Sequence, residues 1–117
     1  MMLVHEFLSC SYDELSEDIV YDDFIKKFRN NIIYVSDNII LKYHKNLSKG
    51  FQAYWNGLNG KTFEGINYYG ITVIPTSEIN SFIENIKNIP DKNIKSLVKI
   101  CRNAVMTKNV SFISVYK

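Results

Sequence analysis

Cysteine, proline and arginine are scarce in this chain of 117 residues, and each shortage argues against a class of protein. Two cysteines, Cys10 and Cys101, are too few for a small secreted domain held together by disulfides. The two prolines, Pro75 and Pro90, fall between strongly patterned segments and mark no linker. We therefore expect one domain over residues 1–117 with reduced cysteines, as in a cytoplasmic protein.

Signals for export and for membrane insertion are missing as well. Residues 1–10 contain no lysine or arginine, and His5 and Glu6 interrupt their apolar residues, so this segment is a poor signal peptide. No apolar run approaches the roughly 18–20 residues that a membrane-spanning helix needs. These observations predict a cytoplasmic protein that makes no membrane contact.

Residues that carry catalytic or metal chemistry are few and scattered. The possible metal ligands, which have none of the spacings typical of zinc sites, are His5, Cys10, His44 and Cys101. The glycines match no phosphate-binding loop, and no GxSxG nucleophile motif occurs. We predict no metal, no cofactor and no small-molecule ligand, and we do not expect an enzyme. An enzyme or small-molecule module of unrecognised type stays open as a third alternative.

Acidic residues are concentrated at the start of the chain. Residues 1–23 hold seven acids and no lysine or arginine, whereas the rest of the chain holds five acids and all fourteen bases. One interpretation places the early acids in solvent or at a helix N-terminus, where the helix dipole favours them. The other is a patch that attracts and holds a basic partner protein. The predicted partner-binding residues are Glu14, Glu17, Asp18, Asp22 and Asp23.

A second charged surface is predicted on a helix over about 92–106. Its basic residues share one flank, away from the apolar stripe; they are Lys92, Lys95, Lys99 and Arg102. This flank either faces solvent or follows the phosphates of a nucleic acid. Arginine, the side chain that most often reads bases, occurs only at Arg29 and Arg102, and no known nucleic-acid-binding motif is present. Nucleic acid is therefore the less favoured partner.

Hydrophobic periodicity and turn signals predict several strands. The apolar run 68–74 predicts a strand buried on both faces, and the alternating run 110–116 predicts a closing strand. The runs 32–35 and 39–43 flank a polar turn, which predicts a hairpin. Residues 2–9 fit either a short strand or the first turn of a helix. Residues 51–55 alternate loosely and also fit a strand, in which Trp55 is either a core residue or a binding hot spot.

Three helices are predicted from apolar stripes and capping residues. One covers about 22–30, one is capped by Thr76 or Ser77 and stopped by Pro90, and one is capped by Asp91 and ends near Asn109. The last two have apolar stripes at helical spacing, in which Cys101 is most simply a core residue. The order of elements predicts an α+β fold in a single domain, with a mainly antiparallel or mixed sheet and about three helices packed on it.

One segment carries a family resemblance. The stretch 68–75, Tyr-Tyr-Gly-Ile-Thr-Val-Ile-Pro, followed by an amphipathic helix with Ile79, Phe82 and Ile83, resembles a segment of small immunity proteins. These proteins belong to bacterial contact-dependent growth inhibition and other polymorphic toxin systems. The resemblance implies a cytoplasmic protein that binds one cognate toxin domain, usually a nuclease, and covers its active or substrate-binding face. The alternative is a small nucleic-acid-binding regulator that uses the basic flank of the 92–106 helix.

Overall fold

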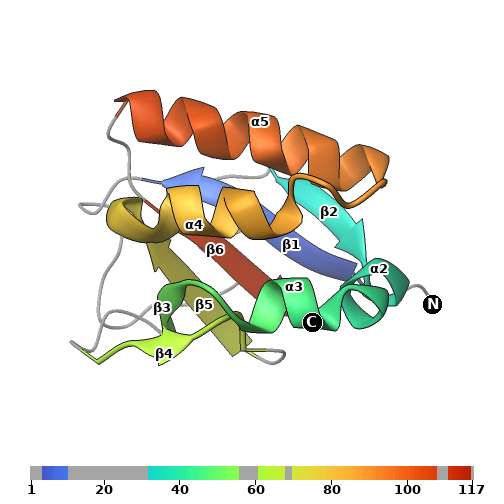
Figure 1. The fold of residues 1–117 in the computed structure, drawn as a ribbon, viewed down its shortest axis with the longest axis horizontal. Coiled ribbons are helices and arrows are strands. Elements are labelled where there is room, and N and C mark those ends of the chain that lie inside the picture. The colour runs from blue at the N-terminus through green and yellow to red at the C-terminus, as the bar shows by residue number, and fades with distance from the viewer. Residues whose placement is uncertain (1–3, 11–31, 56–60, 68–69, 108–110, 117) are drawn as a thin grey trace.

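The structure is a computed structural model that describes residues 4–10, 32–55, 61–67, 70–107 and 111–116. It is an α+β domain in which helices pack on an antiparallel sheet, so the predicted fold class is confirmed (Figure 1). The predicted helix over 22–30 and the predicted helix end at Asn109 lie outside the described residues.

Six strands form the sheet in the order β2-β1-β6-β5-β3-β4, and each described pairing is antiparallel. The strands are β1 (Val4–Cys10), β2 (Ile33–Ser36), β3 (Gln52–Trp55), β4 (Phe63–Glu64), β5 (Gly70–Pro75) and β6 (Ser111–Tyr116). Of the two alternatives for the start of the chain, the strand is therefore confirmed. The strands expected in 51–55, 68–74 and 110–116 are also present.

The last strand of the chain lies in the middle of the sheet. β6 pairs with β1 on one side and with β5 on the other, so that Ser114 faces Phe7 across one ladder and Thr72 across the next. Thr72 and Val73 point to opposite faces of β5 because side chains alternate along a strand, and both are fully buried. The prediction that this strand is buried on both faces is thus confirmed.

Four helices lie in the described part of the chain: α2 (Asp37–Lys42), α3 (His44–Ser48), α4 (Thr76–Ile86) and α5 (Lys92–Thr107). Figure 1 shows α4 and α5 side by side across one face of the sheet, with α2 and α3 along a lower edge. The two long helices match the prediction. The two short helices, α2 and α3, lie in a segment where the sequence predicts a strand over 39–43 and no helix.

The predicted second strand of the hairpin, residues 39–43, is wrong. This segment belongs to helix α2, and β2 pairs with β1 instead. The polar residues between the two runs form a helix start: the Ser36 hydroxyl accepts a hydrogen bond from the Ile39 amide at 3.4 Å, and Asp37 lies in the first turn. A carboxylate there is favoured by the helix dipole. The helix also buries Ile40 in the core.

The predicted cap of α4 by Thr76 or Ser77 is wrong as well. β5 continues to Pro75, which is itself the N-cap residue, and no side chain makes the capping hydrogen bond. Because the helix starts at once, Thr76 is already inside it. A carboxylate from the first turn, that of Glu78, accepts a hydrogen bond from the Gln52 amide at 2.7 Å and so ties α4 to β3.

The cap of α5 is as predicted. One carboxylate oxygen of Asp91 accepts hydrogen bonds from the amides of Asn93 and Ile94, both at 3.0 Å. These are two of the amides that have no partner within a helix. The cap fixes where α5 begins, immediately after Pro90.

Replacing Asp91 with alanine is expected to lower the free energy of unfolding by about 1 kcal/mol, because two helix-terminal amides lose their acceptor. Asp91→Asn is the matched control, since asparagine keeps an acceptor oxygen at the same place and should retain most of the stability. Urea denaturation of both variants measures the difference. Equal stability of the alanine variant and the parent would show that the cap contributes nothing.

The hydrophobic core lies between the sheet and the helices. Strand residues Phe7, Val35, Ala53 and Ile74 pack there against the buried faces of α4 and α5. The predicted stripe of α4 is confirmed, since Ile79, Phe82, Ile83 and Ile86 are all buried. Cys101 is also fully buried, as predicted, and burial raises the pKa of its thiol above the ordinary value. A neutral thiol in this position acts as a small apolar core residue.

Candidate functional site

The acidic residues that the sequence singled out for partner binding are not placed by the structure. Glu14, Glu17, Asp18, Asp22 and Asp23 all lie outside the described residues. The other candidates are described, namely His5, His44, Cys101, Trp55 and the basic residues of the last helix. Cys101 lies in the hydrophobic core, and the others fall into three separate places: a buried polar pair, the exposed face of α5, and a cleft beside α3.

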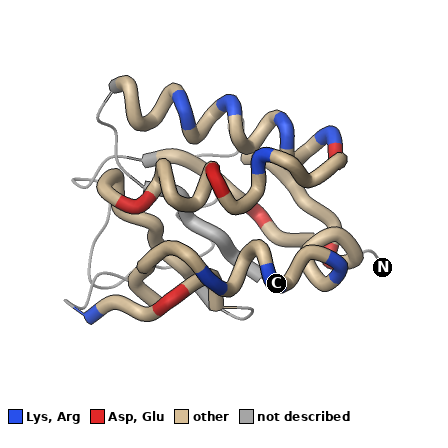
Figure 2. The backbone as a smooth tube through the Cα atoms, viewed as in Figure 1, with Lys and Arg blue, Asp and Glu red and all other residues tan. Residues whose placement is uncertain are grey.

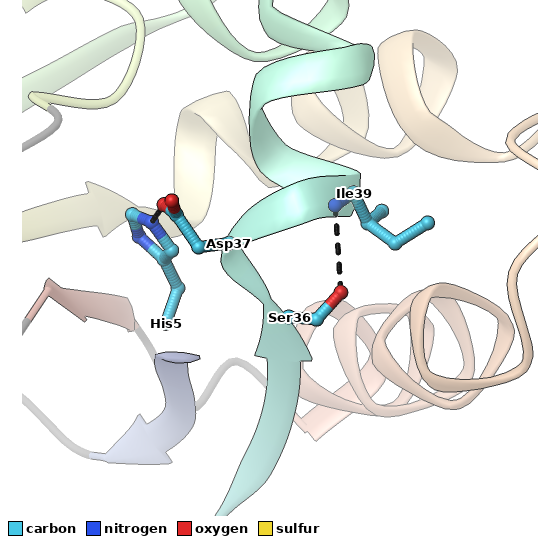
Figure 3. A network of polar contacts seen from close by, with 4 residues as sticks. All are labelled: His5, Ser36, Asp37 and Ile39. Carbon is cyan, nitrogen blue, oxygen red and sulfur yellow. Dashed lines mark hydrogen bonds and ion pairs between the residues drawn. The ribbon is translucent and has the colours of Figure 1, made fainter. Parts of the chain in front are cut away.

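The buried polar pair joins the first strand to the first described helix. His5 is fully buried in β1, and its Nε2 lies 3.1 Å from Oδ1 of Asp37, which is only 14% exposed (Figure 3). Asp37 is the first residue of α2 and directly follows the Ser36 cap, so one turn of chain both starts the helix and contacts the imidazole. The sequence offered no local sign of this pair, because its members are distant in the chain.

Burial lowers the pKa of His5 below its ordinary value of 6.5, and the hydrogen bond and charge of Asp37 oppose this shift without cancelling it. A lowered pKa means that the folded protein binds the imidazole proton less readily than the unfolded chain does. At pH 7 the imidazole is therefore neutral, and its hydrogen bond with the Asp37 side chain joins β1 to α2.

Stability is expected to depend on pH through this histidine. The contribution of the neutral His5 is present in full above about pH 6.5, and it is lost as the pH falls from there toward the lower folded-state pKa. Denaturant unfolding at several pH values measures this loss. In His5→Gln, the free energy of unfolding should change less steeply with pH in this window. Replacing the exposed His44 by Gln should leave this pH dependence unchanged. An unchanged slope in His5→Gln would contradict the assignment.

The exposed face of α5 carries the basic flank that the sequence predicted. All four basic residues of the helix are exposed; they are Lys92, Lys95, Lys99 and Arg102. Figure 2 shows basic positions along the length of this helix and no acidic one within it. Within the described part of the chain none of the four forms an ion pair, whereas neighbouring Lys87 pairs with Glu84 at 2.8 Å. At the far end of the helix Met106 is 83% exposed.

A cleft that sequence reasoning missed lies among α2, α3, β3 and the residues that follow β4. It encloses about 160 Å³. Its apolar walls are Ile40, Leu47, Trp55 and Ile66, and the polar part of its lining is His44, Ser48 and Asn67. Trp55 is therefore half-buried at a cleft and not part of the core cluster.

A signal for this cleft was present in the sequence. Residues 40, 44, 47 and 48 follow a helical spacing, which the hairpin prediction for 39–43 obscured. His44 was expected in a solvated loop; it is exposed, but it lies in α3 and contributes to the cleft.

The walls of the cleft are held by backbone hydrogen bonds. The Ile66 amide donates to the Leu47 carbonyl at 2.9 Å, and the Gly65 amide donates to the Phe51 carbonyl at 2.8 Å. The Trp55 indole donates to the Gly65 carbonyl at 3.1 Å, and its ring stacks on Phe63 with centroids 4.5 Å apart. The segment after β4 is thus fastened to α3 and to β3.

Comparison of the chain with protein-family models, with curated proteins and with solved structures found no match. Function is therefore inferred from the surfaces themselves. Among the described residues, no three histidine, cysteine, aspartate or glutamate side chains gather as metal ligands would. None of the helices in that part of the chain is long and apolar enough to cross a bilayer.

Proposed function

We propose that this chain is an immunity protein that binds a cognate bacterial toxin domain, a nuclease, and neutralises it by covering its active or substrate-binding face. The observation that supports this proposal is the junction between β5 and α4. The strand passes directly into the helix at Pro75, and the helix then buries Ile79, Phe82 and Ile83. This is the segment that resembles immunity proteins.

The uneven charge of the chain supports the same proposal. A nuclease attracts a polyanion, so its active face is basic. The seven acids in residues 1–23, with no lysine or arginine among them, provide a charge pattern that competes with a nucleic-acid backbone for such a face. The bases lie elsewhere in the chain, and four of them lie on α5.

Co-purification tests the proposal directly. The tagged chain is expressed together with the product of the gene immediately upstream of its own, and the eluate is analysed for stoichiometry. We expect a stable one-to-one complex, and we expect the partner to be toxic when it is expressed alone. Failure to retain the partner, together with a harmless partner, would remove the support for an immunity protein.

Charge reversal tests the role of the acids. The triple variant Glu17→Lys, Asp18→Lys and Asp22→Lys is expected to weaken toxin binding and to slow association by about tenfold or more at low salt, because electrostatic steering is strongest there. Stopped-flow mixing across a range of salt concentrations measures this rate. Reversal of the exposed Glu64 and Glu84, on other elements, changes the net charge by four where the triple variant changes it by six, and so controls for most of that change. Unchanged kinetics and unchanged protection of cells by the triple variant would contradict this role.

A second candidate function rests on the exposed face of α5. Its row of exposed bases also fits the phosphates of a nucleic acid, which is the alternative prediction. A gel retardation assay with random duplex DNA, repeated across salt concentrations, tests it. Binding through phosphate contacts should fall steeply with salt, and reversal of Lys95 and Lys99 should reduce that dependence. No retardation at low salt would eliminate this candidate.

A further inference from the structure

The cleft beside α3 has the dimensions of a site for one small ring. Its volume of about 160 Å³ is close to the roughly 150 Å³ of an engineered apolar protein cavity that holds benzene. We propose that this cleft binds a single aromatic ring that carries one hydrogen-bonding group, as a phenol does. The inference is independent of the toxin-binding proposal, because it rests only on this cleft.

The chemistry of the lining matches such a ring. Ile40 and Leu47 form apolar walls, and Trp55 adds an aromatic one. Aromatic rings pack favourably against one another in offset or edge-on arrangements, which favours an aromatic occupant over an aliphatic one of the same size. The side chains of His44 and Ser48 border the same space and can hydrogen-bond one hydroxyl group.

The lining also argues against a charged ligand. Among the described residues that border the cleft there is no lysine, arginine, aspartate or glutamate. A different hollow of about 260 Å³ is more open and has two lysines, Lys45 and Lys49, in its lining. An anion would be drawn to that hollow and not to the apolar cleft, so the occupant of the cleft is neutral.

The cleft is shaped before any ligand arrives. The Trp55 indole N–H is already engaged by the Gly65 carbonyl and its ring rests on Phe63, so the aromatic wall has a fixed orientation. The bond between the Ile66 amide and the Leu47 carbonyl fixes the segment after β4 against α3. A site of this kind binds with little loss of conformational freedom in the protein.

Trp55 makes the experiment simple, because it is the only tryptophan in the chain and its fluorescence reports on the cleft. The folded full-length chain is titrated with phenol, and cyclohexanol is the control because it keeps the hydroxyl but lacks the aromatic ring. We expect a saturable change in Trp55 emission with phenol, and at least tenfold weaker binding of cyclohexanol. Amide chemical shifts should change at Leu47, Ser48 and Ile66 and remain unchanged along α5.

Two variants sharpen the test. Ser48→Leu fills the space and should abolish the phenol response, and His44→Leu should shift the preference from phenol toward toluene. If Ser48→Leu does not fold, the chemical-shift map of the parent protein decides alone. No saturable response, or shift changes away from the cleft, would overturn the proposal.

N-acetyl-tyrosinamide distinguishes the source of the ring. If it binds as phenol does, the opening admits a tyrosine side chain carried on a peptide, and the ring is supplied by a protein. If phenol binds and N-acetyl-tyrosinamide does not, the natural occupant is a free small molecule. Both results support the site, and neither depends on whether the chain neutralises a toxin.

Discussion

Replacing Phe82 with alanine is expected to lower the free energy of unfolding by about 3–5 kcal/mol, the largest effect of any substitution considered for this protein. Phe82 lies on α4, is fully buried, and meets the Phe51 ring edge-on with centroids 5.0 Å apart. On its other side it stacks near Phe7 of β1, at 6.4 Å. One ring therefore joins α4 to the central sheet and to the segment before β3. Its removal leaves a cavity between α4, β1 and the segment before β3, and these cannot all move inward to fill it.

Urea denaturation of Phe82→Ala and Phe82→Leu measures this effect. Leucine refills part of the volume, so the leucine variant should lose much less stability than the alanine variant. Because small domains have a total stability of only about 5–15 kcal/mol, Phe82→Ala should also be partly unfolded at physiological temperature. A loss below about 1 kcal/mol would show that the core can repack around this position.

Gly65→Ala is expected to lower the free energy of unfolding by about 3 kcal/mol, from two causes that act together. Gly65 has φ of 81°, a conformation that residues with a side chain rarely adopt. A Cβ at this position would also collide with the backbone of Ser48 in α3. Because the colliding atoms are backbone, the segment after β4 must move away from α3 to relieve the contact. The hydrogen bonds that hold the cleft would then be lost with it.

Gly50→Ala is the matched comparison for this prediction. Gly50 also has a positive φ, of 90°, but the atoms nearest to a Cβ there belong to the side chain of Asn85 and not to backbone. That side chain donates to the Lys49 carbonyl and can swing aside with the loss of this exposed hydrogen bond, so the main cost is the backbone strain, about 1–2 kcal/mol.

Thermal or urea denaturation ranks the two glycine variants, and phenol titration of each gives an independent measure of the cleft. Gly65→Ala should lose phenol binding while it is still folded, and Gly50→Ala should retain it. Equal destabilisation by the two substitutions would indicate that φ alone matters and that the approach of Gly65 to Ser48 is not tight.

The basic face of α5, the cleft beside α3 and the early acids can be tested independently because they belong to different segments. In Figure 1, α5 lies at one edge of the domain, whereas α3 and β4 lie toward the opposite edge. A substitution on the basic face of α5 should therefore leave the phenol response unchanged. Charge reversal of the early acids should leave the phenol response and the basic face of α5 unchanged, and it should affect only the binding of a toxin. This separation lets one set of variants serve as the control for another.

Local signals in the sequence determined several elements of this protein correctly. The spacing of Ile79, Phe82, Ile83 and Ile86 predicts the buried face of α4, because a helix brings such residues to one side whatever surrounds it. The start of α5 at Asp91 follows from hydrogen bonds within one turn of chain. The apolar run of β5 predicts a strand with two covered faces, and the order of the elements predicts the α+β class.

Tertiary structure decided the remainder. The run at 39–43 is compatible with a strand or a helix, and the pairing of β2 with β1 and the burial of Ile40 in the core selected the helix. The central place of β6, the contact of His5 with Asp37 and the cleft around Trp55 all join residues that are far apart in sequence. Periodicity and capping are properties of one segment alone. Which segments come together depends on how all of them bury their apolar faces at once, and no single stretch of sequence contains that information.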